Sequence, residues 1–193
     1  KSSMITGLIK FKNRKDAGKR LTKRLKKYAK EDAVVYALPR GGVVLGFEIA
    51  QALSLPLDII ATRKIGHPSN AEYAIGAVDE NDTVILNEEE ASSISQQWLE
   101  KEIKRQGEEA RRRSMLYRQN RRHHNIAGKI AIIVDDGIAT GFTMRLAVKT
   151  IKSQHPEKII VAVPVAPSES IHELKEEGVD EVIVLEPPEE FLG

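Results

Sequence analysis

Short apolar runs separated by polar turns set the pattern of this chain. They lie at residues 33–38, 57–62, 130–134, 159–163 and 181–185, and Val and Ile are frequent in them. Runs of this length bounded by turn residues are typical of buried strands. Between several of the runs, apolar residues recur at helical spacing. Strands that alternate with helices predict an α/β protein with a mostly parallel sheet and helices on both faces.

Several stretches carry the helical pattern. Asp16 is the predicted N-cap of a basic helix, whose apolar stripe consists of Ala17, Leu21, Leu25 and Tyr28. Residues 43–53 are apolar nearly all round, which predicts a buried helix. Apolar residues at helical spacing predict another helix from Met144 to Ile151. Ser168 is expected to cap a helix over Glu169–Glu177, with Gly178 directly after its end.

The middle of the chain follows other patterns. Residues 75–78 and 83–86 predict two short strands joined as a hairpin, and residues 65–73 are expected to form a loop because of their composition. Residues 88–122 form a long polar stretch, which predicts one helix, or two with an interruption near Gly107. Trp98 is expected to anchor this stretch against a core.

Composition is that of one globular domain over residues 1–193. Charged residues make up 30% of the chain and hydrophobic residues 41%. The chain has no cysteine, which excludes disulfides and thiolate metal sites. We see no apolar run of membrane-spanning length and no secretory signal, so a cytoplasmic location is expected.

Charge is unevenly distributed along the chain. Residues 10–30 hold eleven basic residues and one acidic residue, whereas residues 167–193 hold nine acidic residues and one basic residue. The two ends could pack near each other, or both could be solvated faces. A third alternative is that the basic end binds nucleic acid.

The strongest candidate chemistry follows the strand at 130–134. Two adjacent carboxylates, Asp135 and Asp136, end that strand, and a loop rich in Gly and Thr leads into the next helix. A helix N-terminus with free N–H groups suits a phosphate, and glycines let the backbone approach it. The carboxylates suit hydroxyl groups or a metal ion. Together they indicate a phosphorylated sugar, although a glycine-rich turn with a solvated acidic tip is the simpler alternative.

Two further loops follow predicted strands. Arg40, Gly41 and Gly42 come after residues 33–38, and Arg63 and Lys64 come after residues 57–62. A tight turn would explain the first, and a surface basic pair the second. However, ligands of parallel sheets bind at the carboxyl ends of the strands, where all three loops lie. Walker A and dinucleotide-binding glycine patterns are absent from the chain.

The stretch 130–143 resembles the phosphoribosyl pyrophosphate (PRPP) motif of type I phosphoribosyltransferases. The resemblance covers about residues 10–190 and implies a twisted core of five strands with a small hood. It implies transfer of ribose 5-phosphate from PRPP to a small nitrogenous base, with pyrophosphate release and Mg²⁺ as cofactor, as in nucleotide metabolism. Asp135 and Asp136 would bind Mg²⁺ and the ribose, and Arg40, Gly41 and Gly42 would bind pyrophosphate. The residues expected to bind the ribose and the 5′-phosphate are Asp135, Asp136, Gly137, Ile138, Ala139, Thr140, Gly141, Phe142 and Thr143.

The resemblance also suggests catalytic residues. Arg63-Lys64 and Glu72-Tyr73 look like the Arg-Lys and Glu-Tyr pairs of adenine phosphoribosyltransferases, at a shorter spacing. We therefore expect Arg63 and Lys64 to assist the leaving group and Glu72 to act as a general base, although Glu72 could be only an exposed glutamate. Enzymes for 6-oxopurines carry an aspartate where this chain has Ala139, which disfavours a 6-oxopurine acceptor. The chain also resembles a group of uncharacterised phosphoribosyltransferases with Leu-Pro-Arg-Gly-Gly and Val-Asp-Asp-Gly-x-Ala-Thr-Gly motifs.

Other functions remain open at this stage. A PRPP-sensing regulator that binds nucleic acid would use the basic residues 10–30 and 111–113. A ribose-phosphate binder with phosphorylase or hydrolase chemistry is a third alternative. A homodimer is an open alternative for the assembly, and a membrane partner is not expected.

Overall fold

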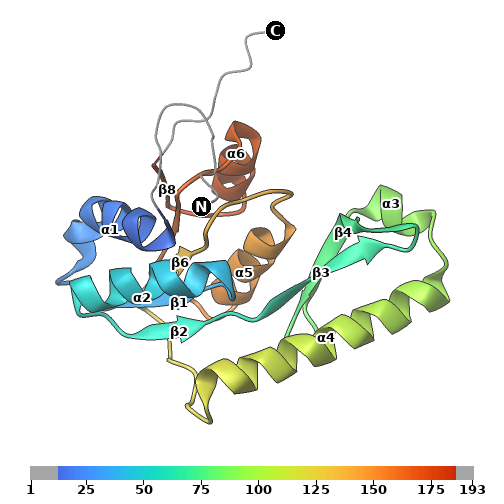
Figure 1. Cartoon of the computed structure of the whole chain (residues 1–193), viewed down its shortest axis with the longest axis horizontal. Helices are drawn as coiled ribbons and strands as arrows, with labels where there is room; N and C mark the ends of the chain where they lie inside the picture. Colours follow the sequence, from blue (N-terminus) through green and yellow to red (C-terminus); the bar gives the residue numbers. More distant parts are fainter. Residues whose placement is uncertain (1–12, 186–193) are drawn as a thin grey trace, which may run out of the picture.

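A computed structural model describes residues 13–185, and its centre is a parallel sheet of five strands (Figure 1). The strand order is β2 (Leu57–Ile59), β1 (Ala33–Ala37), β6 (Ile130–Val134), β7 (Lys158–Val163) and β8 (Glu181–Val184). Every neighbouring pair in this sheet is parallel. The predicted α/β class and the expected core of five strands are therefore confirmed.

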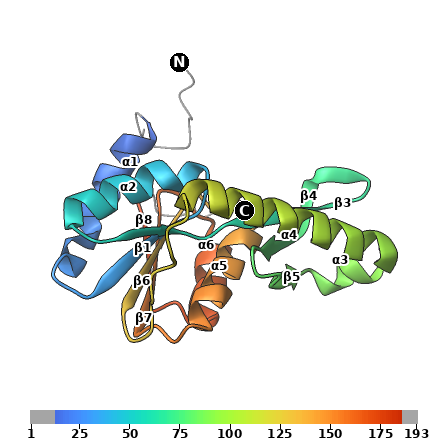
Figure 2. The same ribbon diagram turned by 90° about the horizontal axis from the view of Figure 1, so that it is seen from below.

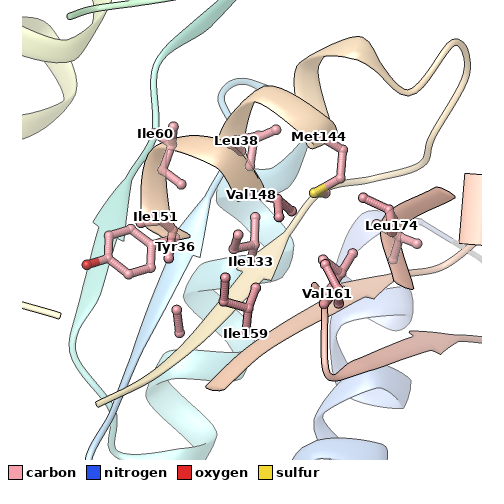
Figure 3. Close-up of a cluster of buried hydrophobic side chains, with 14 of the residues drawn as sticks. Tyr36, Leu38, Ile60, Ile133, Met144, Val148, Ile151, Ile159, Val161 and Leu174 are labelled. Atoms are coloured by element: carbon pink, nitrogen blue, oxygen red, sulfur yellow. The ribbon is translucent and has the colours of Figure 1, made fainter. Parts of the chain in front are cut away.

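Helices cover both faces of this sheet because the strands are apolar on both faces. On one face, α1 (Arg14–Leu25), the short 3₁₀ helix η1 (Lys26–Tyr28) and α2 (Gly41–Leu53) pack on one set of strand residues, including Ile132. On the other face, α5 (Phe142–Lys152) and α6 (Ser168–Glu176) pack on the alternate set, including Ile133 (Figure 3). Alternation along each strand thus supplies two cores.

A second, smaller unit is inserted between β2 and β6, and we call it the hood. It consists of an antiparallel sheet in the order β3 (Thr62–His67), β4 (Asn70–Asp79) and β5 (Val84–Leu86), with α3 (Glu88–Ser92) and α4 (Gln96–Arg118). Its own core includes Ile65, Ile75 and Leu99. The hood projects from one end of the molecule, and α4 runs from it back toward β2 (Figure 2). Trp98 packs against the hood core, which confirms its anchoring role.

The predicted loop at 65–73 is wrong, because most of it belongs to the β3–β4 hairpin. Ile65 pairs with Gly76 and Gly66 pairs with Ala74, and a register shift lies between these pairs. A turn at residues 68–69 joins the strands. Backbone pairing therefore overrides a composition that is typical of loops. The strand predicted at 57–62 is also divided, since β2 ends at Ile59 and Thr62 opens β3. The predicted hairpin of residues 75–78 and 83–86 is confirmed by the pairing of β4 with β5.

Some helix ends also differ from prediction. The N-cap of α1 is Asn13, whose side chain accepts from the Asp16 N–H at 2.9 Å, so Asp16 lies in the first turn instead. Ser168 is the first residue of α6 and does not cap it, whereas Gly178 follows its end with the expected positive φ. The long polar stretch breaks at residues 93–95, and Gly107 lies inside α4. No helix among residues 13–185 is long and apolar enough to cross a membrane.

Candidate functional site

The candidate site forms where the neighbouring strands β1 and β6 end. Just after β1, the Leu38 N–H donates to the Val134 carbonyl of β6 at 3.0 Å, which holds the following loops side by side. A Cβ on Gly41 would lie 2.0 Å from Asp136 Oδ2, and one on Gly42 would lie 2.6 Å from the Val134 carbonyl oxygen. Gly42 therefore requires glycine, because its neighbour is backbone, whereas a side chain at Gly41 would push the Asp136 carboxylate aside. This close contact joins the predicted pyrophosphate loop, residues 39–42, to the acidic pair.

The acidic pair consists of two carboxylates in different surroundings. The Asp136 N–H donates to Asp135 Oδ1 at 2.8 Å. Burial raises the pKa of Asp135 to about 8, and the neighbouring Asp136 charge adds to this shift. Asp136 is exposed and accepts from the Arg14 guanidinium at 2.9 Å. The site thus pairs one partly buried carboxyl with one exposed carboxylate.

This donor set fits Mg²⁺. Over residues 13–185 no group of three or more His, Cys, Asp or Glu side chains could hold a metal ion. Mg²⁺ commonly binds through one or two carboxylates, with substrate phosphates and water as its other ligands. Two adjacent carboxylates at the edge of the predicted phosphate-binding loop match that requirement, so Asp135 and Asp136 would hold the ion together with a phosphorylated substrate.

The loop after the acidic pair leads into the N-terminus of α5. Gly141 is the N-cap residue and has φ +83°, which favours glycine, and its carbonyl accepts from the Arg145 N–H at 2.9 Å. Helix α5 starts at Phe142, so Phe142 and Thr143, the last two residues of the predicted loop, lie in its first turn. A cavity of about 190 Å³ lies here, lined by residues 137–144 and by Lys64, Ala74 and Gly76 of the hood. Free N–H groups of a helix start therefore border a space that suits a phosphate.

The structure separates the two basic residues predicted together. Lys64 lines the cavity at the start of α5, and its Nζ lies 3.3 Å from Glu72 Oε2. Arg63 faces the other way, where its Nε donates to Gln106 Oε1 of α4 at 2.9 Å. Burial lowers the pKa of Arg63, and the nearby Arg113 charge lowers it further. Successive residues of a strand point to opposite faces, so only Lys64 belongs to this cavity.

Two other predicted site residues, Glu72 and Arg40, do not line this cavity. Glu72 is in β4 beside Lys64, and its side chain is 91% exposed. Arg40, whose peptide bond with Pro39 is cis, lines a second cavity of about 370 Å³ between its loop and α4. The α4 residues that line this second cavity are Arg112, Arg113, Leu116 and Tyr117. Arg40 therefore lies beside α4 and does not line the cavity that Lys64 borders.

Arg14 was not among the predicted site residues. Residues 10–30 are recognisable as a basic segment, but nothing in that segment connects a particular member with the acidic pair. Arg14 and Asp136 are 122 residues apart, and no local pattern relates them. The uneven charge was a partial signal, because Lys27 also pairs across the chain with Glu181 at 2.7 Å. The alternative in which the two chain ends pack together is confirmed for that pair, while residues 186–193 lie outside the described part.

Comparisons with known proteins identify the family of this chain. A family model described as "Phosphoribosyl transferase domain" matches residues 8–186. The Mycobacterium tuberculosis protein named "Putative phosphoribosyl transferase Rv0571c" is 36% identical over 185 residues, which are 95% of this chain and 42% of that protein. The chain therefore spans about two-fifths of the length of that curated relative.

Solved structures share the fold of this chain. The crystal structure of TT1426 from Thermus thermophilus has a TM-score of 0.74 and 38% sequence identity, covering 95% of this chain and 87% of its own. A purine phosphoribosyltransferase from Pyrococcus horikoshii has a TM-score of 0.51 and 16% identity, over 89% of this chain and 81% of its own. The second likeness shows the fold alone. With the family match over nearly the whole sequence, the chain belongs to the phosphoribosyl transferase domain family.

Proposed function

We propose that this protein transfers ribose 5-phosphate from PRPP to a nitrogen atom of a small base and releases pyrophosphate. One observation carries the proposal. Gly41 of the 39–42 loop touches Asp136, and the helix start at Gly141 follows a few residues later. The loops to which we assign the pyrophosphate, the ribose and the 5′-phosphate thus follow one another in the order in which PRPP carries these groups.

Each part of PRPP then has a partner in the chain. Residues 137–143 would bind the 5′-phosphate through backbone N–H groups and the hydroxyls of Thr140 and Thr143. Asp135 and Asp136 would accept hydrogen bonds from the ribose hydroxyls. Gly41, Gly42 and Arg40 would bind the pyrophosphate. Binding at three fixed points orients C1′ toward the acceptor, and it supplies binding energy remote from the reacting bond.

The reaction exchanges one bond at C1′ for another. The bond from C1′ to the pyrophosphate oxygen breaks as the acceptor nitrogen bonds to C1′, and the nitrogen loses a proton. Positive charge develops at the sugar and negative charge on the pyrophosphate. Asp135 and Asp136 would favour the positive charge at the sugar, and Arg40 would stabilise the negative charge on the pyrophosphate. One well-placed donor is worth roughly 10²–10³ in rate. Mg²⁺, when bound, would neutralise part of the pyrophosphate charge.

The roles of Glu72 and of the acceptor belong to the same proposal. Glu72 would accept the acceptor's proton, with Lys64 beside it at 3.3 Å. Ala139 is exposed on the 137–143 loop and has no side-chain group to accept a hydrogen bond. We therefore propose an acceptor other than a 6-oxopurine.

The regulator alternative receives less support from the charges. In the arginine cluster at residues 111–113, Arg112 and Arg113 pair with Glu109 at 2.7 and 3.0 Å, and Arg111 pairs with Asp82 at 2.8 Å. Arginines that are paired with carboxylates have less charge to offer to nucleic-acid phosphates. The transferase is therefore the function that we propose.

The test is a screen of PRPP and Mg²⁺ against a panel of nitrogenous bases, with pyrophosphate release as the readout. We expect release that depends on one class of base and that the double variant Asp135→Asn, Asp136→Asn abolishes. Release without any base would indicate a hydrolase instead. PRPP binding without release for any base, combined with salt-dependent nucleic-acid binding, would favour the regulator.

A further inference from the structure

Arg14 of α1 forms an ion pair with Asp136, the exposed carboxylate of the acidic pair. Arg14 Nη2 and Nε donate to Asp136 Oδ2 at 2.9 and 3.2 Å. We propose that Arg14 balances the negative charge of the acidic pair in the ligand-free protein. When PRPP binds, Mg²⁺ replaces Arg14 as the partner of Asp136. The inference rests on the proposed function, and it assigns to α1 a part in ligand binding.

The packing of α1 against α2 places Arg14 beside Asp136. Gly18 of α1 lies so close to α2 that a Cβ there would be 3.0 Å from Glu48 Cβ and 3.3 Å from Leu45 Cα. Leu21 and Leu25 of α1 are fully buried in the core that includes Leu45 and Ile49 of α2. Because α2 begins at Gly41, which touches Asp136, the contact between the helices brings the first turn of α1 to the acidic pair.

The start of α1 is fixed as well. Asn13 caps the helix through its side chain, which defines where Arg14 leaves the first turn. The next residue, Lys15, is directed elsewhere, since its Nζ lies 3.9 Å from Glu48 Oε1. The ion pair of Arg14 with Asp136 is thus a specific product of this geometry rather than a general effect of a basic helix.

The chemistry of Asp136 makes the two cations competitors. Both donors of Arg14 converge on a single oxygen, Oδ2, and a carboxylate oxygen is the atom that Mg²⁺ prefers. Two cations held a few ångströms apart on one carboxylate repel each other. The side chains of Arg14 and Asp136 are 57% and 38% exposed, and ion pairs of such exposure are weak. Arg14 can therefore balance the charge of the free site and still be displaced from it.

The experiment measures PRPP binding to the full chain by calorimetry at a series of Mg²⁺ concentrations. The variant Arg14→Gln removes the competing charge, so we expect the Mg²⁺ concentration for half-maximal PRPP binding to fall about 2- to 5-fold, the range of an exposed ion pair. At saturating Mg²⁺, its PRPP affinity should stay within about twofold of wild type on the same ground. Arg14→Lys keeps the charge and should require nearly as much Mg²⁺ as wild type. The matched control is Lys19→Gln, an exposed charge removal on the same helix that should leave the Mg²⁺ requirement unchanged.

Two results would overturn the inference. An unchanged or higher Mg²⁺ requirement in Arg14→Gln would show that Arg14 does not compete for Asp136. A large loss of PRPP affinity at saturating Mg²⁺ would show that Arg14 binds the ligand directly instead. The wild-type arm reports separately on the proposed function, because the absence of Mg²⁺-dependent PRPP binding there would remove both proposals.

Discussion

Arg118, the last residue of α4, forms a buried ion pair with Asp58 of β2. Its Nε donates to Asp58 Oδ1 at 3.1 Å, and the side chains are only 9% and 4% exposed. The same guanidinium donates to the Ile59 carbonyl at 2.7 Å and to the Glu80 carboxylate at 3.0 Å. Arg118 therefore ties the returning end of the hood to the edge of the parallel sheet.

Replacing Arg118 with methionine should destabilise the protein by about 3–5 kcal/mol, because the buried Asp58 carboxylate would lose the guanidinium and keep only two backbone N–H donors and the nearby His123. Urea unfolding of the ligand-free protein measures the loss. Arg112→Met, which removes an exposed partner of Glu109 in the same helix, is the control and should unfold close to wild type. Equal stability of the two variants would mean that the buried pair does not hold the hood.

Asp135→Asn should stabilise the ligand-free protein, by an amount that depends on pH. The carboxyl has its ordinary pKa of 3.8 in the unfolded chain and about 8 in the folded protein. Between these values the folded state binds more protons, so wild-type stability falls as pH rises. The advantage of Asp135→Asn should accordingly grow from about pH 4 to pH 8 and then level off. Thermal unfolding across this range measures it. Asp136→Asn removes the neighbouring charge that adds to the shift of Asp135, so it should show a smaller trend in the same direction.

Gly41→Ala should weaken PRPP binding while leaving the fold intact. The new methyl group would collide with the Asp136 carboxylate, which must then move away from the ribose site. Loss of one hydrogen bond to a charged group costs about 1.5–3 kcal/mol, or roughly 10- to 100-fold in affinity. Calorimetry with PRPP and Mg²⁺ tests this, with the exposed change Val44→Ala in the same helical turn as the control. Wild-type affinity in Gly41→Ala would contradict the assignment of this contact to the site.

Lys64→Ala should reduce turnover much more than Arg63→Ala. Lys64 borders the cavity at the start of α5, so its removal should lower kcat/KM by roughly 10²–10³. Arg63 contacts α4 instead, so its removal should affect hood stability more than turnover. Pyrophosphate release with the identified base is the assay. A loss in Arg63→Ala as large as that in Lys64→Ala would place Arg63 in the site after all.

Glu72→Gln should lower kcat by roughly 10²–10⁴ and leave PRPP affinity close to wild type, if Glu72 is the general base. Glu88→Gln, an exposed change elsewhere in the hood, provides the control. Wild-type turnover in Glu72→Gln would leave Glu72 as a surface residue, and the proton would then leave through water or the pyrophosphate.

Local patterns were sufficient to predict the parallel sheet and the loops at its edge. Buried strands such as β6 are apolar on both faces, and the Asp, Gly and Thr residues that follow it mark a helix start suited to phosphate. The contact of Gly41 with Asp136 follows from the pairing of β1 with β6, since parallel neighbours end at the same edge. Both features depend on residues that are close in sequence or on adjacent strands.

The predictions that failed concern features set by strand pairing or by packing between distant elements, not by local composition. Residues 65–73 have the composition of a loop, and only their pairing across the hairpin makes most of them strands. Arg63 and Lys64 are neighbours in β3, and successive side chains of a strand point to opposite faces. Because this segment was predicted as a loop, the separation of the two residues was not predicted. Arg14 reaches Asp136 only because Gly18 allows two helices to pack closely, and no feature of residues 10–30 alone identifies that arginine.

The hood has one entry and one exit, between β2 and β6, while both helix starts of the candidate site belong to the parallel sheet unit. The chain could thus exchange this whole segment during evolution without rethreading the sheet. Lys64 and Glu72 would change with it, and the loops to which we assign the phosphates would remain. Under the proposed function, an exchange of the hood would alter the acceptor side of the site and keep the loops assigned to the sugar-phosphate donor.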